Sequence, residues 1–140
     1  MKFTLVLDGK ILRKRAHMTT KNGFIFDPDS KYKIELSDYL YENKLYPETP
    51  FQEGLKVTYE CYFKLPKSLT KKESEERLER GWAYEVRKDC DNIAKIYNDI
   101  FQYGMLEGKF FKDDHFIVEL VVKKLYSDKD EFIIVTFEEV

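Results

Sequence analysis

The sequence has few of the residues that mark disulfide-rich, membrane-spanning or low-complexity proteins. Its two cysteines, Cys61 and Cys90, are too few for a disulfide scaffold and lack the spacing of a zinc site. The apolar run near the start ends at Asp8, which is too early for a signal-peptide core. No stretch approaches the ~20 apolar residues of a membrane span, and no internal repeat is visible. We therefore expect a soluble cytoplasmic protein without a membrane partner.

Neither sign of charge dominates the chain. The 24 basic and 26 acidic residues leave a net charge of −2, which excludes a uniformly basic nucleic-acid-binding coat. The signs are nevertheless segregated, since residues 9–26 contain no acidic residue. The basic residues of this segment are Lys10, Arg13, Lys14, Arg15 and Lys21. The pattern predicts either a local basic face that meets a polyanion or a merely solvated loop.

Length and apolar patterning predict one compact α+β domain over residues 1–140. Residues 55–64 alternate apolar and polar, as in a half-buried strand with one polar face and Cys61 inside. Further strands are expected at 2–7, 116–125 and 131–138, the last two as an antiparallel hairpin, with a short extended piece at 24–26. Helices are expected at 30–44, at 70–80 behind a Thr70–Glu73 capping box, and from 91 onward. The expected architecture is a mixed or antiparallel sheet of about four strands packed against two to three helices.

The run Asp89-Cys90-Asp91-Asn92-Ile93-Ala94-Lys95 opens a strongly amphipathic helix. At 100° per residue, one side gathers Ile93, Ile96, Tyr97, Ile100 and Phe101. The other side gathers Asp91, Lys95, Asn98 and Asp99. The helix should therefore bury its apolar stripe and present Asp91 and Lys95 together, one turn apart. Cys90 is expected to pack inward and to be chemically silent.

Two carboxylates one residue apart, a helical lysine and the distant pair Asp113-Asp114 are what a Mg²⁺-dependent phosphodiesterase needs. Mg²⁺ prefers oxygen ligands near ~2.1 Å and keeps waters and substrate phosphates in its shell. Lys95 would supply positive charge against the scissile phosphate. The pair leads into a strand, where neighbours point to opposite sides, so one acid could complete the site of Asp89 and Asp91. The alternative is that the two aspartates simply cap the helix.

In combination these segments resemble the RusA-type Holliday junction resolvases, Mg²⁺-dependent endonucleases of bacteria and their prophages. Their pattern Asp-x-Asp-Asn-x-x-Lys is matched by Asp89, Asp91, Asn92 and Lys95. Their Asp-Asp-x-x-Ile-Val-Glu-Leu with a later Lys is matched from Asp113 to Leu120 and by Lys124. The segment 65–72 resembles the Pro-Lys-Ser segment before the acidic motif, and the basic loop from Arg13 to Pro28 resembles their arginine-rich loop.

The resemblance implies a homodimer that nicks two opposed strands of a four-way DNA junction in recombination and repair. It implies Asp89, Asp91 and Asp114 as ligands of Mg²⁺, for which Mn²⁺ could substitute, with Asp113 as an adjacent candidate. Asp89, Asp91, Lys95 and Asp114 would be catalytic. The basic residues expected to bind DNA are Lys10, Arg13, Lys14, Arg15, Arg87, Lys88 and Lys124. The alternatives are a nuclease for other branched DNA and a junction-binding protein that does not cut.

Overall fold

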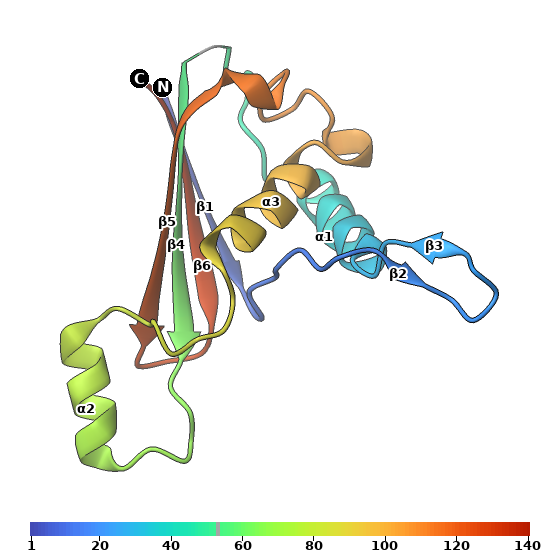
Figure 1. Cartoon of the computed structure of the whole chain (residues 1–140). Coiled ribbons are helices and arrows are strands. Elements are labelled where there is room, and N and C mark those ends of the chain that lie inside the picture. The colour runs from blue at the N-terminus through green and yellow to red at the C-terminus, as the bar shows by residue number, and fades with distance from the viewer. Residues whose placement is uncertain (53) are drawn as a thin grey trace.

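The computed structural model describes residues 1–52 and 54–140 and contains a four-stranded mixed sheet (Figure 1). The strands are β1 (Lys2–Asp8), β4 (Leu55–Lys64), β5 (Ile117–Ser127) and β6 (Phe132–Glu139), in the order β1-β6-β4-β5. The pair β4–β5 is parallel, whereas β1–β6 and β4–β6 are antiparallel. A two-stranded hairpin, β2 (Met18–Thr19) with β3 (Ile25–Phe26), projects away from the sheet.

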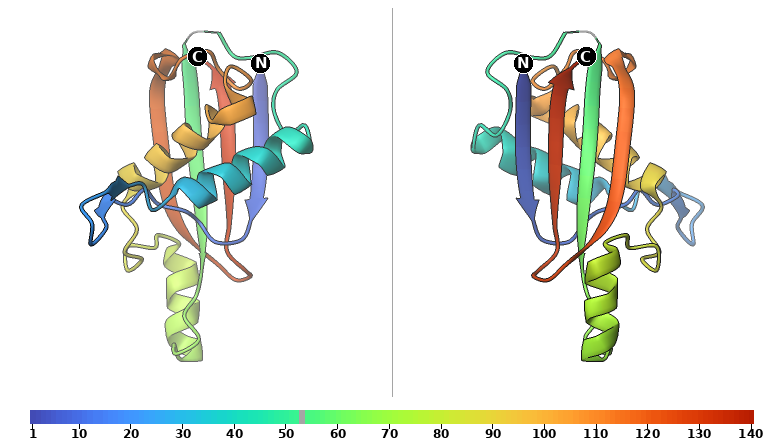
Figure 2. Two further views of the ribbon diagram at one scale, coloured as in Figure 1. Left: turned by 90° about the vertical axis from the view of Figure 1, so that its right-hand side faces the viewer. Right: turned by 90° about the vertical axis from the view of Figure 1, so that its left-hand side faces the viewer.

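The helices lie on one side of the sheet, apart from α2. Helices α1 (Ser30–Glu42) and α3 (Cys90–Phe101) cover one face and leave the opposite face uncovered, as Figure 2 shows. Helix α2 (Lys71–Arg80) lies beyond the end of the sheet. Two short 3-10 turns, η1 (Gly104–Leu106) and η2 (Asp114–Phe116), lie between α3 and β5. The predicted α+β class and its mixed sheet with helices are confirmed.

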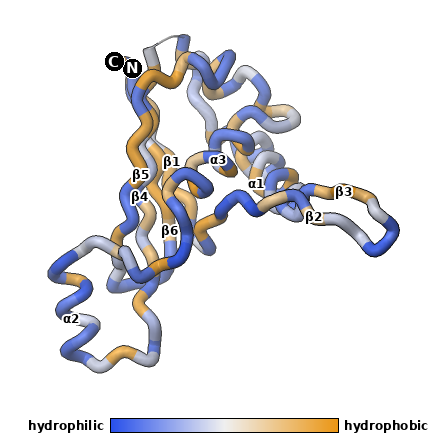
Figure 3. Tube along the Cα trace, viewed as in Figure 1, coloured by the Kyte–Doolittle hydropathy of each residue, from blue (hydrophilic) through white to orange (hydrophobic). Residues whose placement is uncertain are grey.

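Burial follows the predicted apolar patterns. Alternate β4 residues are buried toward the helices, from Leu55 to Phe63, and Cys61 has no exposed surface. The whole predicted stripe of α3 is buried against them. Phe101 and Phe110 pack on Phe137 of β6, each with its ring centroid 5.1 Å from the Phe137 ring. The tube in Figure 3 shows the resulting concentration of hydrophobic residues along the strands.

The capping box predicted for α2 is present. The Thr70 hydroxyl accepts from the Glu73 N–H, and the Glu73 carboxylate accepts from the Thr70 N–H, both at 3.1 Å. Gly81 ends the helix with a φ of 86°, a conformation that a side chain would strain. No residue of α2 is buried. Arg80 holds the helix to the following loop through a 2.6 Å contact with Glu85.

The predicted antiparallel hairpin of the last two strands is wrong, because β4 lies between β5 and β6. The prediction rested on closeness in sequence alone. Two strand spacings amount to about 9.6 Å, which the four residues 128–131 can bridge because each spans up to about 3.3 Å. The inner position suits β4, which alternates cleanly and bonds a strand on both sides. The long connection from β4 to β5, through α2 and α3, is what a parallel pair requires.

Candidate functional site at the N-terminus of α3

Two carboxylates stand at the start of α3 without capping it. The helix begins after Asp89, whose carbonyl accepts the first helical hydrogen bond, from the Ile93 N–H at 3.1 Å. The Asp89 side chain makes no capping hydrogen bond, and Asp91 follows in the first turn. Both residues are exposed. An exposed carboxylate at a helix N-terminus that makes no capping hydrogen bond is available to a ligand.

Asp91 and Lys95 lie one turn apart on the exposed side, as the helical spacing predicted. The Lys95 Nζ is 3.8 Å from the Asp91 Oδ2, and the side chains are 59% and 68% exposed respectively. An ion pair this open to water adds little to stability. Both charges can therefore reorient toward a ligand at small cost.

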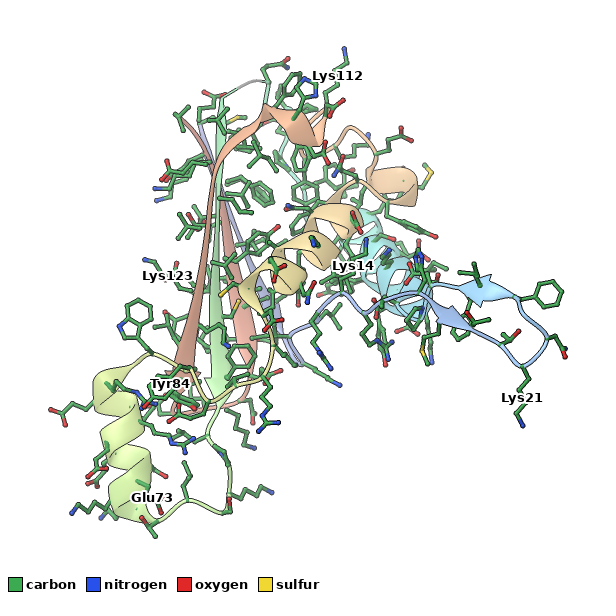
Figure 4. The ribbon with its side chains drawn as sticks, in the orientation of Figure 1. Lys14, Lys21, Glu73, Tyr84, Lys112 and Lys123 are labelled. Carbon is green, nitrogen blue, oxygen red and sulfur yellow. The ribbon has the colours of Figure 1, made fainter. Side chains whose placement is uncertain are left out.

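The basic segment predicted to bind DNA docks on the same turn of α3. The Lys14 N–H donates to the Asn92 carbonyl at 2.8 Å, and the Lys14 Nζ lies 3.5 Å from the Asp99 Oδ2. Figure 4 shows Lys14 against α3. A surface cavity of about 390 Å³ separates the two elements and is lined by Lys14, Arg15, Ala16, Asn92 and Lys95. Three cations around one cavity suit a phosphate group.

An ion-pair network holds the basic segment in place. Asp29, which is 1% exposed, accepts from the Arg15 N–H and from the Arg15 Nε, both at 2.8 Å. Lys33 of α1 donates to Asp27 at 2.7 Å and lies 3.6 Å from Asp99. Burial lowers the pKa of Lys33, but the hydrogen bond and charge of Asp27, together with Asp99, outweigh it and leave that pKa raised. The same hydrogen bond from Lys33 lowers the pKa of Asp27.

Sequence reasoning missed Lys33, Asp27 and Asp29. The sequence predicts a helix over 30–44, and Asp29 occupies the N-cap position of α1. Its side chain makes no cap hydrogen bond and binds Arg15 instead. The signal in the sequence was the position of Asp27 and Asp29, directly after a basic segment without acidic residues. Two acids there can form ion pairs with the basic residues if the chain folds back.

The other residues predicted to bind DNA fall into two groups. Lys10, Arg13, Arg15 and Lys88 line a second cavity of about 210 Å³, and Arg87 is exposed near it in sequence. Lys88 is also structural, because its Nζ donates to the Ile11 carbonyl at 2.6 Å, and burial lowers its pKa. Lys124 donates to the Val86 carbonyl and so holds the loop that leads to α3.

The acid pair lies at the start of the 3-10 turn η2, which separates it from the strand that it was predicted to lead into directly. Asp113 precedes η2 and accepts from the His115 N–H at 3.1 Å, and its carboxylate is 2.8 Å from the His115 Nδ1. These contacts, the backbone hydrogen bond first, lower the pKa of Asp113. Asp113 therefore holds the turn. Asp114 begins η2 and is exposed, as is His115.

Within one chain, Asp114 is separated from Asp89 and Asp91. The exposed Cys90, which was predicted to pack inward, places its Sγ 3.9 Å from the Val122 carbonyl, halfway along β5. Asp114 lies just before Ile117, the first residue of β5. Ile117 and Val122 are five residues apart, which is about 17 Å along the strand. Figure 4 shows this separation, because Lys112 is the neighbour of the acid pair in sequence and Lys123 is the neighbour of Val122.

Within residues 1–52 and 54–140, no group of three or more His, Cys, Asp or Glu side chains lies close enough to hold a metal ion. Two carboxylates at the start of α3 still fit Mg²⁺, which takes few protein ligands and keeps the rest of its shell for water and phosphate oxygens. In the same described part of the chain, no helix is long and apolar enough to cross a membrane.

Comparisons with known proteins identify the family of the chain. The chain is similar to the uncharacterized protein YqaN of Bacillus subtilis (strain 168), with 28% identity over 133 residues that cover 92% of this chain and 89% of that protein. The family profile described as endodeoxyribonuclease RusA matches residues 10–138, which include the basic segment, α3 and the acid pair. The chain therefore belongs to the RusA endodeoxyribonuclease family.

Proposed function

We propose that this protein is a Mg²⁺-dependent endonuclease that resolves Holliday junctions by paired nicks during DNA recombination and repair. The observation that carries the proposal is the start of α3. There the exposed Asp89 side chain makes no capping hydrogen bond, and Asp91 lies 3.8 Å from Lys95, which lines a cavity together with Lys14 and Arg15. Carboxylates that can hold a metal ion, close to a cationic cavity that can admit a phosphate, suit metal-assisted cleavage of a phosphodiester. Family membership supports the same class of reaction.

The acidic side chains of the site would bind the metal ion, and the basic side chains would bind the phosphate. Asp89 and Asp91 would hold Mg²⁺, which supplies the Lewis acidity for phosphodiester hydrolysis. Lys95 lies within 3.8 Å of Asp91 and can turn its ammonium toward the scissile phosphate, where negative charge grows in the transition state. Lys14 and Arg15, fixed by Asp99 and Asp29, would hold the phosphate in the cavity. The positive charge near the carboxylates offsets their repulsion of the DNA backbone.

We also propose Asp114 as a third ligand and a homodimer as the active form. A four-way junction is nearly symmetric, and a two-fold dimer presents two equivalent sites to two opposed strands. The substrate would be branched DNA, with Mn²⁺ able to replace Mg²⁺. The similarity to a Bacillus subtilis protein supports a bacterial or prophage-encoded origin, and hence action in the cytoplasm.

The test is cleavage of a synthetic four-way junction with Mg²⁺ or Mn²⁺, compared between the wild type and Asp91→Asn. We expect paired nicks by the wild type and none by the variant, while both bind the junction. Asp128→Asn, an exposed acid in the turn after β5, is the matched control and should cleave normally. Undiminished cleavage by Asp91→Asn would contradict the site.

A substrate panel separates this proposal from its alternatives. Flaps, forks and linear duplexes, run beside the junction, should be cut more slowly than the junction. Faster cleavage of a flap or fork would identify a nuclease for other branched DNA. Junction binding without nicks in either metal ion would identify a protein that binds and does not cut.

A further inference from the structure

The hairpin β2–β3 carries an apolar face that projects away from the rest of the domain (Figure 1). Met18 pairs with Phe26 across the two strands. Alternate residues of a strand point to the same face, so Phe24 shares the face of Met18 and Phe26, and Ile25 lies on the opposite one. Met18, Phe24 and Phe26, which we call the apolar hairpin face, are 52%, 71% and 42% exposed respectively. Large apolar side chains gathered on one exposed face indicate a binding surface, whereas isolated ones are common.

The turn that presents Phe24 is held by hydrogen bonds. The Thr20 N–H donates to the Phe24 carbonyl at 2.8 Å, and the Phe24 N–H donates to the Thr20 Oγ1 at 3.1 Å. The Gly23 N–H donates to the Thr20 carbonyl at 3.0 Å, and the φ of Gly23 is 84°, which a side chain would strain. Both backbone groups of Phe24 are therefore fixed to Thr20. A ring on such an ordered support loses less conformational freedom when it binds a ligand.

The root of the hairpin is fixed beside the candidate functional site. Arg15 donates from its Nε to Asp29 at 2.8 Å and from its Nη2 to the Pro28 carbonyl at 2.7 Å, and so joins the two ends of the hairpin. Lys14, the residue before it, donates its N–H to the first turn of α3. Figure 4 shows Lys14 against α3 and Lys21 at the outer turn of the hairpin. Arg15 and Lys21 are six residues apart, so the outer turn lies within about 20 Å of the root, at about 3.3 Å per residue.

The charge around the apolar hairpin face favours DNA as its partner. The hairpin belongs to the segment 9–26, which contains basic residues and no acidic one, and every residue from Arg15 to Phe26 is exposed. Basic residues around an apolar face complement DNA, in which phosphates surround the apolar faces of the bases. Phe and Met side chains inserted between neighbouring bases are a means by which proteins unstack DNA. The cost of unstacking opposes this insertion in a continuous duplex, whereas the stack is already interrupted at the centre of a four-way junction.

We infer that the apolar hairpin face, through Phe24 above all, stacks on bases at the branch point and thereby distinguishes a four-way junction from a linear duplex. The inference rests on the proposed function for the identity of the substrate. Phosphate contacts from the basic segment act on any DNA and give affinity without selectivity. Stacking of an aromatic ring needs an accessible base, which the centre of a junction supplies at a lower cost than a duplex does. Phe24 is then a specificity-determining residue that acts away from the chemistry at α3.

The test compares the affinities for a synthetic four-way junction and for a linear duplex of the same arms, in EDTA so that no metal-dependent cleavage occurs. Phe24→Ala should weaken junction binding at least about 5-fold, which corresponds to the loss of one stacked base, and should change duplex binding less than about 2-fold. Phe24→Tyr keeps the ring and should bind as the wild type does. Ile25→Ala is the matched control, because Ile25 is 74% exposed on the opposite face, and it should also bind normally. Unchanged junction affinity in Phe24→Ala, or equal losses for junction and duplex, would overturn the inference.

A fluorescent base reports the stacking directly. The emission of 2-aminopurine rises when the base loses its stacked neighbours. With 2-aminopurine at the branch point, we expect a rise on binding of the wild type and of Ile25→Ala, and little or no rise at saturating Phe24→Ala. A rise with Phe24→Ala as large as that with the wild type would show that Phe24 does not open the stack.

Failure of this inference can be told apart from failure of the proposed function, because binding is measured without cleavage. If the wild type nicks junctions and Phe24→Ala binds them as tightly, the inference is wrong and the proposed function stands. If the wild type nicks no DNA but its preference for the junction depends on Phe24, the proposed nuclease fails and the inference stands. Wild-type protein that binds the junction no better than the duplex would contradict the inference whatever its activity.

Discussion

Lys33 offers the most informative single substitution outside the candidate site. The Lys33 side chain is only 11% exposed, and its ammonium pairs with two carboxylates. One belongs to Asp27, just after the basic segment, and the other to Asp99 of α3. Lys33→Met keeps most of the side-chain volume and removes the charge. Removing one partner of a buried ion pair costs about 3–5 kcal/mol. Asp27 is 20% exposed and retains a hydrogen bond from the Asp29 N–H, so we expect about 2–3 kcal/mol.

The measurement is urea and thermal unfolding followed by circular dichroism at pH 7. For a chain of this size the loss corresponds to a decrease in Tm of roughly 8 °C. Lys31→Met is the matched control, because Lys31 lies on the same helix with its side chain 79% exposed, 3.8 Å from Glu35. It should change the free energy of unfolding by less than about 0.5 kcal/mol. Junction affinity should also fall in Lys33→Met, since Asp27, which directly follows the basic segment and accepts from the Asp29 N–H, loses its ion pair with α1.

The pH dependence gives the same substitution a second readout. The pKa of Asp27 is lowered in the folded state, so its contribution to stability is present above the ordinary carboxyl pKa of about 3.9 and is lost as pH falls through the folded value. The pKa of Lys33 is raised, so its contribution is lost only at strongly alkaline pH. The deficit of Lys33→Met should therefore be full at pH 7 and shrink below pH 4. Equal Tm values for Lys33→Met and Lys31→Met at pH 7 would show that the Lys33 ion pair does not stabilise the fold.

Three other predictions concern thiols, α2 and DNA. Cys90 is exposed and should react at once with a thiol reagent in the native protein. Cys61 is buried, with its pKa raised to about 12 by desolvation, and should react only on unfolding. Rapid reaction of both thiols in the native protein would contradict this. The ion pair with Arg80 lowers the pKa of Glu85 to about 2, and Glu85→Gln removes this tie between α2 and the following loop. Amide hydrogen exchange should then become faster in α2 and stay unchanged in the sheet. Faster exchange throughout the protein would contradict a local role. Lys14→Ala should reduce the salt dependence of junction affinity by about one phosphate contact, and an unchanged slope would place Lys14 off the DNA.

The local patterns of the sequence predicted the local structure well. The 100° pattern of α3, the alternation of β4 and the capping box of α2 are each set by neighbours in sequence, and each is confirmed. The placement of β4 between β5 and β6 depends on strand pairing over long separations, which periodicity does not encode. A pattern of alternation says that a strand is half-buried and does not say which strand lies beside it.

The site was predictable where it depends on one helix and not where it depends on distant segments. Asp91 and Lys95 are neighbours through helical spacing alone. The anchoring of Arg15 by Asp29 and of Asp27 by Lys33 requires the chain to turn back on α1, and a lysine in a polar helix is usually solvated. The distance from Asp114 to α3 is a property of the whole sheet, so the motif spacing could not reveal it.

The placement of the first strand has a consequence for how the chain folds during synthesis. Among the described residues, strand β1 pairs only with β6, from Lys2 opposite Glu138 to Asp8 opposite Phe132, although most of the domain separates the two strands in sequence. At a translation rate of about 5–20 residues per second, β1 waits roughly 6–25 seconds for its partner. The sheet therefore closes after β6 has left the ribosome, and until then β1 remains an unpaired apolar strand that a chaperone can bind.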